Sequence, residues 1–390
     1  MKVIFYIALF FLLAYLTIDV LIVGEGEERP VVQILAGLGL GSMLFYNFFF
    51  MKRKLAISKN WKFIRTWYYF ILLFVVYYLS ALVGLPSSFS SPTIRNLIIT
   101  LYIFATILFI YNGTINNHLK GISLKLLLLF LLFNGIWEIM LAYTHQLERQ
   151  GMEIINTSAG YVFVMILPML MYIYKKENIW IFSISLLLTL MTGKRGALVI
   201  YVVLILYSFY SFKYLKNSFK LNWKALVFLV VIFIAYNFFV DNTFSSLQHR
   251  ILNFENEKTG AIGSGRNIIW STLIIQYLDG TVLHQIFGFG FFATRSISGF
   301  IAHNDFVEFL IDFGIFGLIT WLLVLYRFHK NIKIVKQHDQ YLFLMLAFCL
   351  IILGGRGLFS GTLRTDNINF SISIGYLLAI ASTKINSVHE

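Results

Sequence analysis

The sequence predicts an all-α, polytopic integral membrane protein, and two observations carry that prediction. Of its 390 residues, 59% are hydrophobic and only 13% are charged, with a mean hydropathy of +0.78. A soluble domain has too little interior to bury so much apolar surface, so lipid must cover part of it. The apolar residues also occur in runs of about 17–23, the length of a helix that crosses a ~30 Å hydrocarbon core.

These runs predict about twelve transmembrane helices in one domain over residues 1–390. The first run resembles a signal peptide, but no small-residue cleavage site follows it, so we expect a retained helix. Cys349 is the lone cysteine, which excludes an internal disulfide and a cysteine metal site. The runs lie at 3–23, 31–50, 67–84, 94–111, 122–143, 154–174, 178–192, 196–212, 223–240, 304–326, 340–354 and 367–383.

Basic residues predict the orientation of these helices. Clusters at 52–65, 175–176, 213–224 and 327–336 follow alternate runs and therefore fall on one side, which the positive-inside rule makes cytoplasmic. Both termini are expected on that side. Most of the net charge of +13 is then explained by topology, and no nucleic-acid partner is needed.

The connection 241–302 falls on the outer side and is the longest in the chain. At about 60 residues it exceeds ordinary loop lengths, and loops of this kind are usually functional or disordered. We expect it to form a long external loop within the membrane domain. It contains an apolar helical face in 268–275 that is suited to lying on the membrane.

Several cations fall on the expected outer side, against the positive-inside rule. A cation at membrane depth is costly and calls for a partner. Two interpretations remain open: separate contacts with headgroups or nearby aspartates, and one shared anionic ligand. Arginine suits a phosphate because its planar fork donates two parallel hydrogen bonds and stays charged. The candidates for contacts with a phosphate-bearing ligand are Lys194, Arg195, Arg266, Arg356 and Arg364.

The run that begins at residue 304 opens with polar residues. Asn304, Asp305, Glu308 and Asp312 fall within a ~100° wedge of a helix, and His303 precedes them. Asn304 is a plausible N-cap, and carboxylates suit the positive end of the helix dipole. That interpretation leaves His303 and Asp312 unexplained. The polar side of a span should face the protein interior or water, and a histidine beside a helix N-terminus tends to stay neutral, as a general base must.

No pattern in the sequence predicts a cofactor or a metal. The segment "GFGFFA" at Gly288–Ala293 formally matches a dinucleotide fingerprint, but no strand–helix–strand unit surrounds it. The D-x-D and H-x-x-x-H patterns are absent. We therefore expect a site that uses neither a cofactor nor a metal ion.

Four segments in order, "TGKRGALVI", "GSGRNIIW", "IFGFGFF" and "HNDFVEFLIDFGIFGLI", resemble the O-antigen polymerase and O-antigen ligase superfamily. These are polytopic bacterial enzymes that act on polyprenyl-diphosphate-linked glycans. The resemblance covers roughly residues 150–330 and implies a place in the bacterial inner membrane. It also implies functional roles for Arg195, Arg266 and His303. Lys194 stands where many relatives have a small residue, so which of Lys194 and Arg195 binds the donor stays open.

The resemblance implies a polysaccharide polymerase whose donor and acceptor are both polyprenyl-diphosphate-linked oligosaccharides. The lipid bilayer, a chain-length regulator and a flippase are its further expected partners. A ligase or protein glycosyltransferase that uses the same donor is the nearest alternative. A flippase is disfavoured because no paired inverted halves and no matching interrupted helices are evident. A membrane glycosyltransferase of another fold would use an acid of the first outer loop, among Asp19, Glu25, Glu27 and Glu28.

Within the polymerase interpretation the residues divide by role. His303, Asp305 and Glu308 are the catalytic candidates, and either carboxylate is an alternative base to the histidine. Asn304 and Asp312 are expected to support them.

Overall fold

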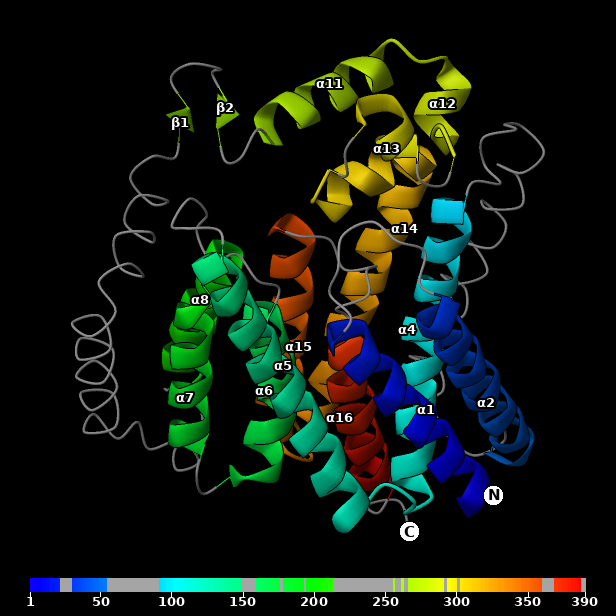
Figure 1. The fold of residues 1–390 in the computed structure, drawn as a ribbon, viewed down its shortest axis with the longest axis vertical. Coiled ribbons are helices and arrows are strands. Elements are labelled where there is room, and N and C mark those ends of the chain that lie inside the picture. The colour runs from blue at the N-terminus through cyan, green and yellow to red at the C-terminus, as the bar shows by residue number, and fades with distance from the viewer. Residues whose placement is uncertain are drawn as a thin grey trace.

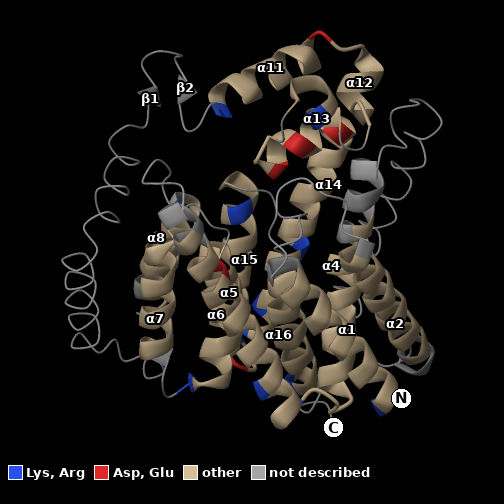
Figure 2. Cartoon of the chain, in the orientation of Figure 1, with Lys and Arg blue, Asp and Glu red and all other residues tan. Residues whose placement is uncertain are grey.

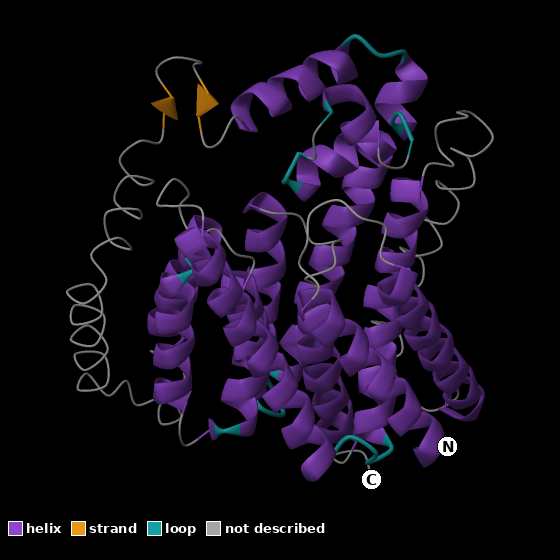
Figure 3. Cartoon of the chain, in the orientation of Figure 1, coloured by secondary structure: helices purple, strands orange, loops and turns teal. Residues whose placement is uncertain are grey.

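The computed structural model describes residues 1–21, 30–54, 91–148, 159–175, 178–192, 194–212, 255–256, 261–262, 266–290, 293–299, 302–359 and 368–386. Helices account for nearly all regular structure in these ranges (Figure 3). The exception is an antiparallel pair of two-residue strands, β1 (Glu255–Asn256) and β2 (Ala261–Ile262). The predicted all-helical class is therefore confirmed for the described part of the chain.

Ten of the predicted runs coincide with helices, and the runs 67–84 and 223–240 lie outside the described residues. Five of the described helices are long and apolar enough to cross a membrane, in the ranges 31–49, 122–141, 305–335, 340–359 and 368–385. The other five contain shorter apolar stretches. The ten are α1 (Lys2–Leu21), α2 (Pro30–Lys54), α4 (Ser91–Ile115), α5 (Ile122–Glu148), α6 (Ala159–Ile173), α7 (Asn178–Met191), α8 (Arg195–Phe212), α14 (Asp305–Val335), α15 (Gln340–Phe359) and α16 (Ile368–Asn386).

These helices form one bundle (Figure 1). Helix α16 packs against α4 and α6, α1 packs against α2, and α15 packs against α6, α8 and α14. Trp321 and Phe328 of α14 and Phe348 of α15 are almost fully buried in this core. Helices α1, α2, α5 and α14 each expose large apolar side chains along one face, as expected where lipid covers the protein.

Three short helices lie over the end of the bundle where α14 begins (Figure 1). They are α11 (Arg266–Leu278), α12 (Val282–Phe287) and α13 (Ala293–Ser298). Leu273, Ala293, Ala302 and Ile311 form a small core beneath them. The described part of the predicted long loop is thus a helical cap, held to α14 by its own apolar contacts.

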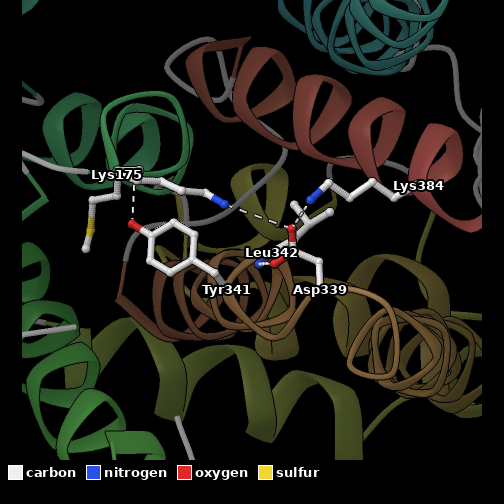
Figure 4. A network of polar contacts seen from close by, with 6 residues as sticks. Lys175, Asp339, Tyr341, Leu342 and Lys384 are labelled. Atoms are coloured by element: carbon white, nitrogen blue, oxygen red, sulfur yellow. Dashed lines mark hydrogen bonds and ion pairs between the residues drawn. The ribbon is translucent and has the colours of Figure 1, made fainter. Parts of the chain in front are cut away.

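The opposite end of the bundle carries a network around Asp339 (Figure 4). Its Oδ2 atom pairs with the Nζ of Lys384 and lies 4.0 Å from the Nζ of Lys175. These lysines follow α6 and end α16, while Asp339 precedes α15. The basic positions 175 and 327–336 therefore share one end of the molecule with the C-terminal helix, as the predicted alternation requires.

Candidate functional site

The start of α14 is a capped helix terminus. Asn304 has extended backbone angles, and its Oδ1 accepts hydrogen bonds from the backbone N–H groups of Phe306 (2.9 Å) and Val307 (3.3 Å). This is the geometry of an N-cap, which satisfies two of the donors that a helix leaves unpaired at its first turn. The predicted capping role of Asn304 is confirmed.

His303 is held at the entry to this helix. Its φ angle is +54°, a left-handed conformation that is uncommon for any residue other than glycine. The backbone N–H of His303 donates to Oε1 of Glu308 at 3.2 Å, and the indole Nε1 of Trp270 donates to the neighbouring carbonyl of Ala302 at 2.7 Å. Contacts on both sides therefore fix the backbone that carries the imidazole, and the His303 side chain remains partly exposed.

The two other carboxylates of the wedge are buried against different segments. Asp305 is 2% exposed and lies beside Gly357 of α15, where a Cβ atom would come within 3.1 Å of Oδ2. Asp312 is 7% exposed, and its Oδ1 accepts the backbone N–H of Thr294 at 3.0 Å. Asp312 thus anchors the first turn of α13. This contact explains why a carboxylate occurs two turns into α14, which helix capping alone did not. Figure 2 shows the acidic residues together where α13 meets α14.

Tyr161 of α6 contacts two of the predicted cations, and no sequence pattern had indicated a role for this residue. Its buried ring lies 4.4 Å from the guanidinium carbon of Arg356 and 5.8 Å from the Nζ of Lys194, measured to the ring centroid. A cation over the face of an aromatic ring is attracted by the ring quadrupole. At Gly196, a Cβ atom would overlap the Tyr161 hydroxyl, so only glycine fits there.

Arg266 reaches the same region from the cap. Its Nη1 donates to the backbone carbonyl of Phe359 at 2.9 Å, at the C-terminal end of α15. That end carries the negative pole of the helix dipole, which favours a cation. A Cβ atom at Gly196 would also overlap the Cβ of Phe359. The starts of α8 and α11 therefore meet at the end of α15, three residues beyond Arg356.

The predicted cations differ in how far their side chains are exposed to solvent. Lys194 and Arg266 are partly exposed, whereas Arg356 is 1% exposed and faces the Tyr161 ring. Arg195 is the first residue of α8, but its side chain lies outside the described part of the chain, as do Arg364 and the acidic residues 25–28. Among the residues that the structure describes, no group of three or more histidine, cysteine or acidic side chains is arranged to hold a metal ion.

Residues 180–322 match a family model described as O-antigen ligase. This match supports the resemblance to the O-antigen polymerase and ligase superfamily. The matched segment runs from α7 to the middle of α14 and contains the predicted site residues Lys194, Arg195, Arg266, His303, Asn304, Asp305, Glu308 and Asp312. No curated protein matches the sequence.

Two contributors to the site lie outside the matched segment. Tyr161 precedes it, and Arg356 follows it. Both are brought to the segment by packing, because α15 lies between α6, α8 and α14. The sequence signal that would have found Tyr161 is weak, since one tyrosine in an apolar helix ordinarily indicates a core or interfacial position.

Proposed function

We propose that the protein is a polysaccharide polymerase that moves a growing glycan from polyprenyl diphosphate onto a lipid-linked repeat unit, in O-antigen, capsule or exopolysaccharide synthesis. The match of residues 180–322 to the O-antigen ligase family model supports the substrate class. The observation that carries the proposal is the meeting of Lys194, Arg266 and the start of α14 around the end of α15, at one end of an apolar bundle. Lys194 lies over the Tyr161 ring that Arg356 of α15 also faces, Arg266 donates to the Phe359 carbonyl, and Asp305, two residues after His303, lies beside Gly357. There a lipid tail can stay in the bilayer while its sugar reaches water.

The partly exposed cations bind the donor diphosphate. Arg266 presents a guanidinium at the start of α11, and Lys194 and Arg195 lie at the start of α8. Fixed positive charge stabilises the diphosphate as it departs, which removes the need for a metal ion. Arg356 is buried beneath the Tyr161 ring, so its contribution in this conformation is to position that ring beside Lys194.

His303 accepts the proton from the acceptor hydroxyl. As the acceptor oxygen bonds to the anomeric carbon of the donor, the bond from that carbon to the diphosphate oxygen breaks. The proton goes to the imidazole, and polyprenyl diphosphate leaves with the electron pair. Glu308 holds the His303 backbone, and Asp305 lies beside it, so either carboxylate is an alternative base.

Two other functions deserve comparison. A ligase or protein O-oligosaccharyltransferase would use the same donor, the same cations and a base at the same place, but a different acceptor. A flippase or transporter would need interrupted helices, and α14 is interrupted at Gly314. Transporters built from repeats carry a matching break in a second helix, whereas the break in α14 is filled by the cap backbone at Phe289 and Gly290.

We further propose a twelve-span topology in the bacterial inner membrane, with both termini cytoplasmic and the helical cap at the outer side of the membrane. Lys175, Lys384 and the basic positions 327–336 gather at one end, and the cap lies at the other. An excess of lysine and arginine marks the cytoplasmic side.

Purified protein in lipid tests the proposed reaction directly. It is incubated with a polyprenyl-diphosphate-linked oligosaccharide as the single substrate, and separately with an added glycolipid or protein acceptor. A polymerase yields a ladder of longer lipid-linked glycans from the single substrate. Product that forms with the added acceptor alone would identify a ligase or protein glycosyltransferase. Movement of intact substrate across the bilayer without transfer would identify a flippase.

A further inference from the structure

Helix α14 is broken at Gly314, and a turn of the cap fills the break. Gly314 has φ +66° and ψ −168°, far from helical values. The carbonyl groups of Ile311 and Asp312, just before it, accept hydrogen bonds from the backbone N–H groups of Phe289 (2.9 Å) and Gly290 (3.0 Å). The segment that resembled a dinucleotide fingerprint thus pairs with the interrupted helix.

This contact is made backbone against backbone. A Cβ atom at Gly314 would overlap the carbonyl group of Ile286, and one at Gly288 would overlap the carbonyl group of Asp312. Gly288 also has a positive φ of +82°. Glycine is required at both positions because no side chain fits between α12 and α14.

Charged residues farther along α14 allow the depth of the break in the membrane to be inferred. Arg327 and Lys330 are exposed on α14 and mark the edge of the hydrocarbon core at the Asp339 end of the bundle. From Arg327 back to Gly314 the helix rises about 20 Å at ~1.5 Å per residue. Because the hydrocarbon core is about 30 Å thick, Gly314 and the end of α12 lie about 10 Å inside its other boundary. Irregular backbone at that depth must satisfy its own polar groups, as the Phe289 and Gly290 N–H groups do.

The side chains of α12 suit the same depth. Val282, Leu283 and Phe287 are 69%, 68% and 49% exposed, and the ring of Phe287 lies 6.3 Å from that of Phe316 on α14. The exposed apolar surface of α12 therefore continues the exposed apolar strip of α14, which consists of Ile315, Phe316, Ile319, Leu322 and Leu323.

The polar groups beside this surface are paired within the cap. The amide nitrogen of Gln285 donates to the carbonyl group of Leu278 at 3.0 Å, and the Tyr277 hydroxyl donates to the carbonyl group of Gln285 at 2.6 Å. His284 stacks on Phe289 with ring centroids 4.5 Å apart. No aspartate, glutamate, lysine or arginine occurs between Thr281 and Phe292.

From these observations we infer that α12 and the turn through Gly290 form a re-entrant element within the bilayer, and that its exposed face contacts the acyl chains of the leaflet on the Asn304 side. The segment 282–290 is then part of the membrane domain, although the sequence placed it within an external loop. It enters and leaves on the same side, and its backbone completes α14 where that helix is interrupted.

Site-directed spin labelling tests this placement in protein reconstituted in lipid. In a Cys349→Ala background, single cysteines replace Val282 or Leu283, with Phe316 as the lipid-facing reference and Asp279 as the water-facing reference. Collision rates are measured with oxygen, which concentrates in hydrocarbon, and with a water-soluble nickel chelate. We expect labels at 282 and 283 to match the label at 316 within about twofold, with high oxygen and low nickel accessibility.

Two results would overturn the inference. Nickel accessibility at 282 and 283 equal to that at 279 would place α12 in water. Low accessibility to both reagents would show that a second copy or another protein covers the face. Depth measured independently, by quenching with lipids that carry a nitroxide at different acyl positions, distinguishes a misfolded variant from a displaced helix.

Discussion

Each acidic residue at the start of α14 contacts a different neighbour. The structure therefore indicates a different role for each of them, whereas the sequence had grouped all three on one side of the helix. Helical periodicity correctly predicted that Asp305, Glu308 and Asp312 share one side, and the N-cap residue was also predictable. Their partners were not, because Gly357 and Thr294 reach the helix only through tertiary packing. Glu308 accepts the hydrogen bond of the His303 backbone N–H, whereas Asp312 accepts that of Thr294 in α13.

Replacement of His303 tests the proposed base. We expect His303→Ala to slow transfer by about 10²–10⁴-fold, the usual effect of losing an acid–base group, because no imidazole then accepts the proton. Donor binding should change little, since a neutral imidazole contributes little to holding a diphosphate. Single-turnover transfer and donor binding, each measured across pH, check both expectations.

The matched variants are Asp305→Asn and Glu308→Gln. Glutamine at 308 keeps an oxygen that can accept the His303 backbone N–H, so its effect reports charge more than structure. If His303→Ala transfers sugar at the normal rate while one of these two variants is inactive, the base is that carboxylate.

Arg266 gives a second prediction for a single residue. Lysine keeps the charge but loses the planar fork, so Arg266→Lys should weaken donor binding by roughly 10–100-fold, as for one charge-assisted hydrogen bond of about 1.5–3 kcal/mol. Arg295→Lys on the exposed face of α13 is the control and should bind normally. Titration with the lipid-linked donor measures both. Equal affinity of Arg266→Lys and wild type would reduce Arg266 to a contact with the Phe359 carbonyl.

Among whole elements, the sequence predicted helices well and their interruptions poorly. The apolar runs located ten helices because membrane helices follow directly from hydropathy. The break at Gly314 was not predictable, since a glycine in an apolar helix is ordinarily tolerated. The pairing of Tyr161 with Arg356 joins α6 to α15, a contact that neither helix reveals by its own periodicity.

The junction of α6, α15 and α16 gives a prediction about stability and pH. Asp339 is the N-cap of α15, because its Oδ1 accepts the Leu342 backbone N–H at 2.8 Å. Burial raises the pKa of this carboxyl, but the hydrogen bonds from Lys384 and Leu342 and the charge of Lys175 outweigh burial and leave the pKa below its ordinary value. A carboxyl with a lowered pKa in the folded state stabilises that state above its unfolded pKa, and this stabilisation is lost as pH falls through the folded pKa.

Asp339→Asn should therefore destabilise the protein by about 1 kcal/mol near neutral pH, with the cap retained. Asp339→Ala should cost about 1 kcal/mol more, because it also removes the cap. The difference between wild type and Asp339→Asn should begin to shrink below about pH 4, the ordinary pKa of an aspartate, and should disappear once the pH has fallen through the lowered pKa of the folded state. Thermal unfolding in detergent across pH measures these differences, with Asp279→Asn as an exposed control. A pH-independent difference would contradict the ionic explanation.

The whole molecule has two chemically different ends. One end carries Lys175, Asp339 and Lys384, together with the N-terminus and the end of α16 (Figure 1). The other carries the helical cap, the N-capped start of α14 and the cations around Tyr161. A transferase that receives lipid-linked substrates from one side of the membrane needs this polarity, because its site must open to one compartment while its basic end fixes the orientation.

Accessibility of matched glutamines tests that orientation. Gln276 lies on α11 in the cap and Gln337 follows α14 at the basic end, and both are exposed. In a Cys349→Ala background, we expect a membrane-impermeant maleimide to label Gln276→Cys in intact spheroplasts and Gln337→Cys only in inverted vesicles. The reason is that the lysines and arginines of positions 327–336 resist translocation across the membrane. Cys349 is buried, so its replacement removes background without altering either surface. Labelling of both cysteines from the same side would contradict the topology, and a reversed pattern would place the proposed site in the cytoplasm, where lipid-linked repeat units would have to be joined before export.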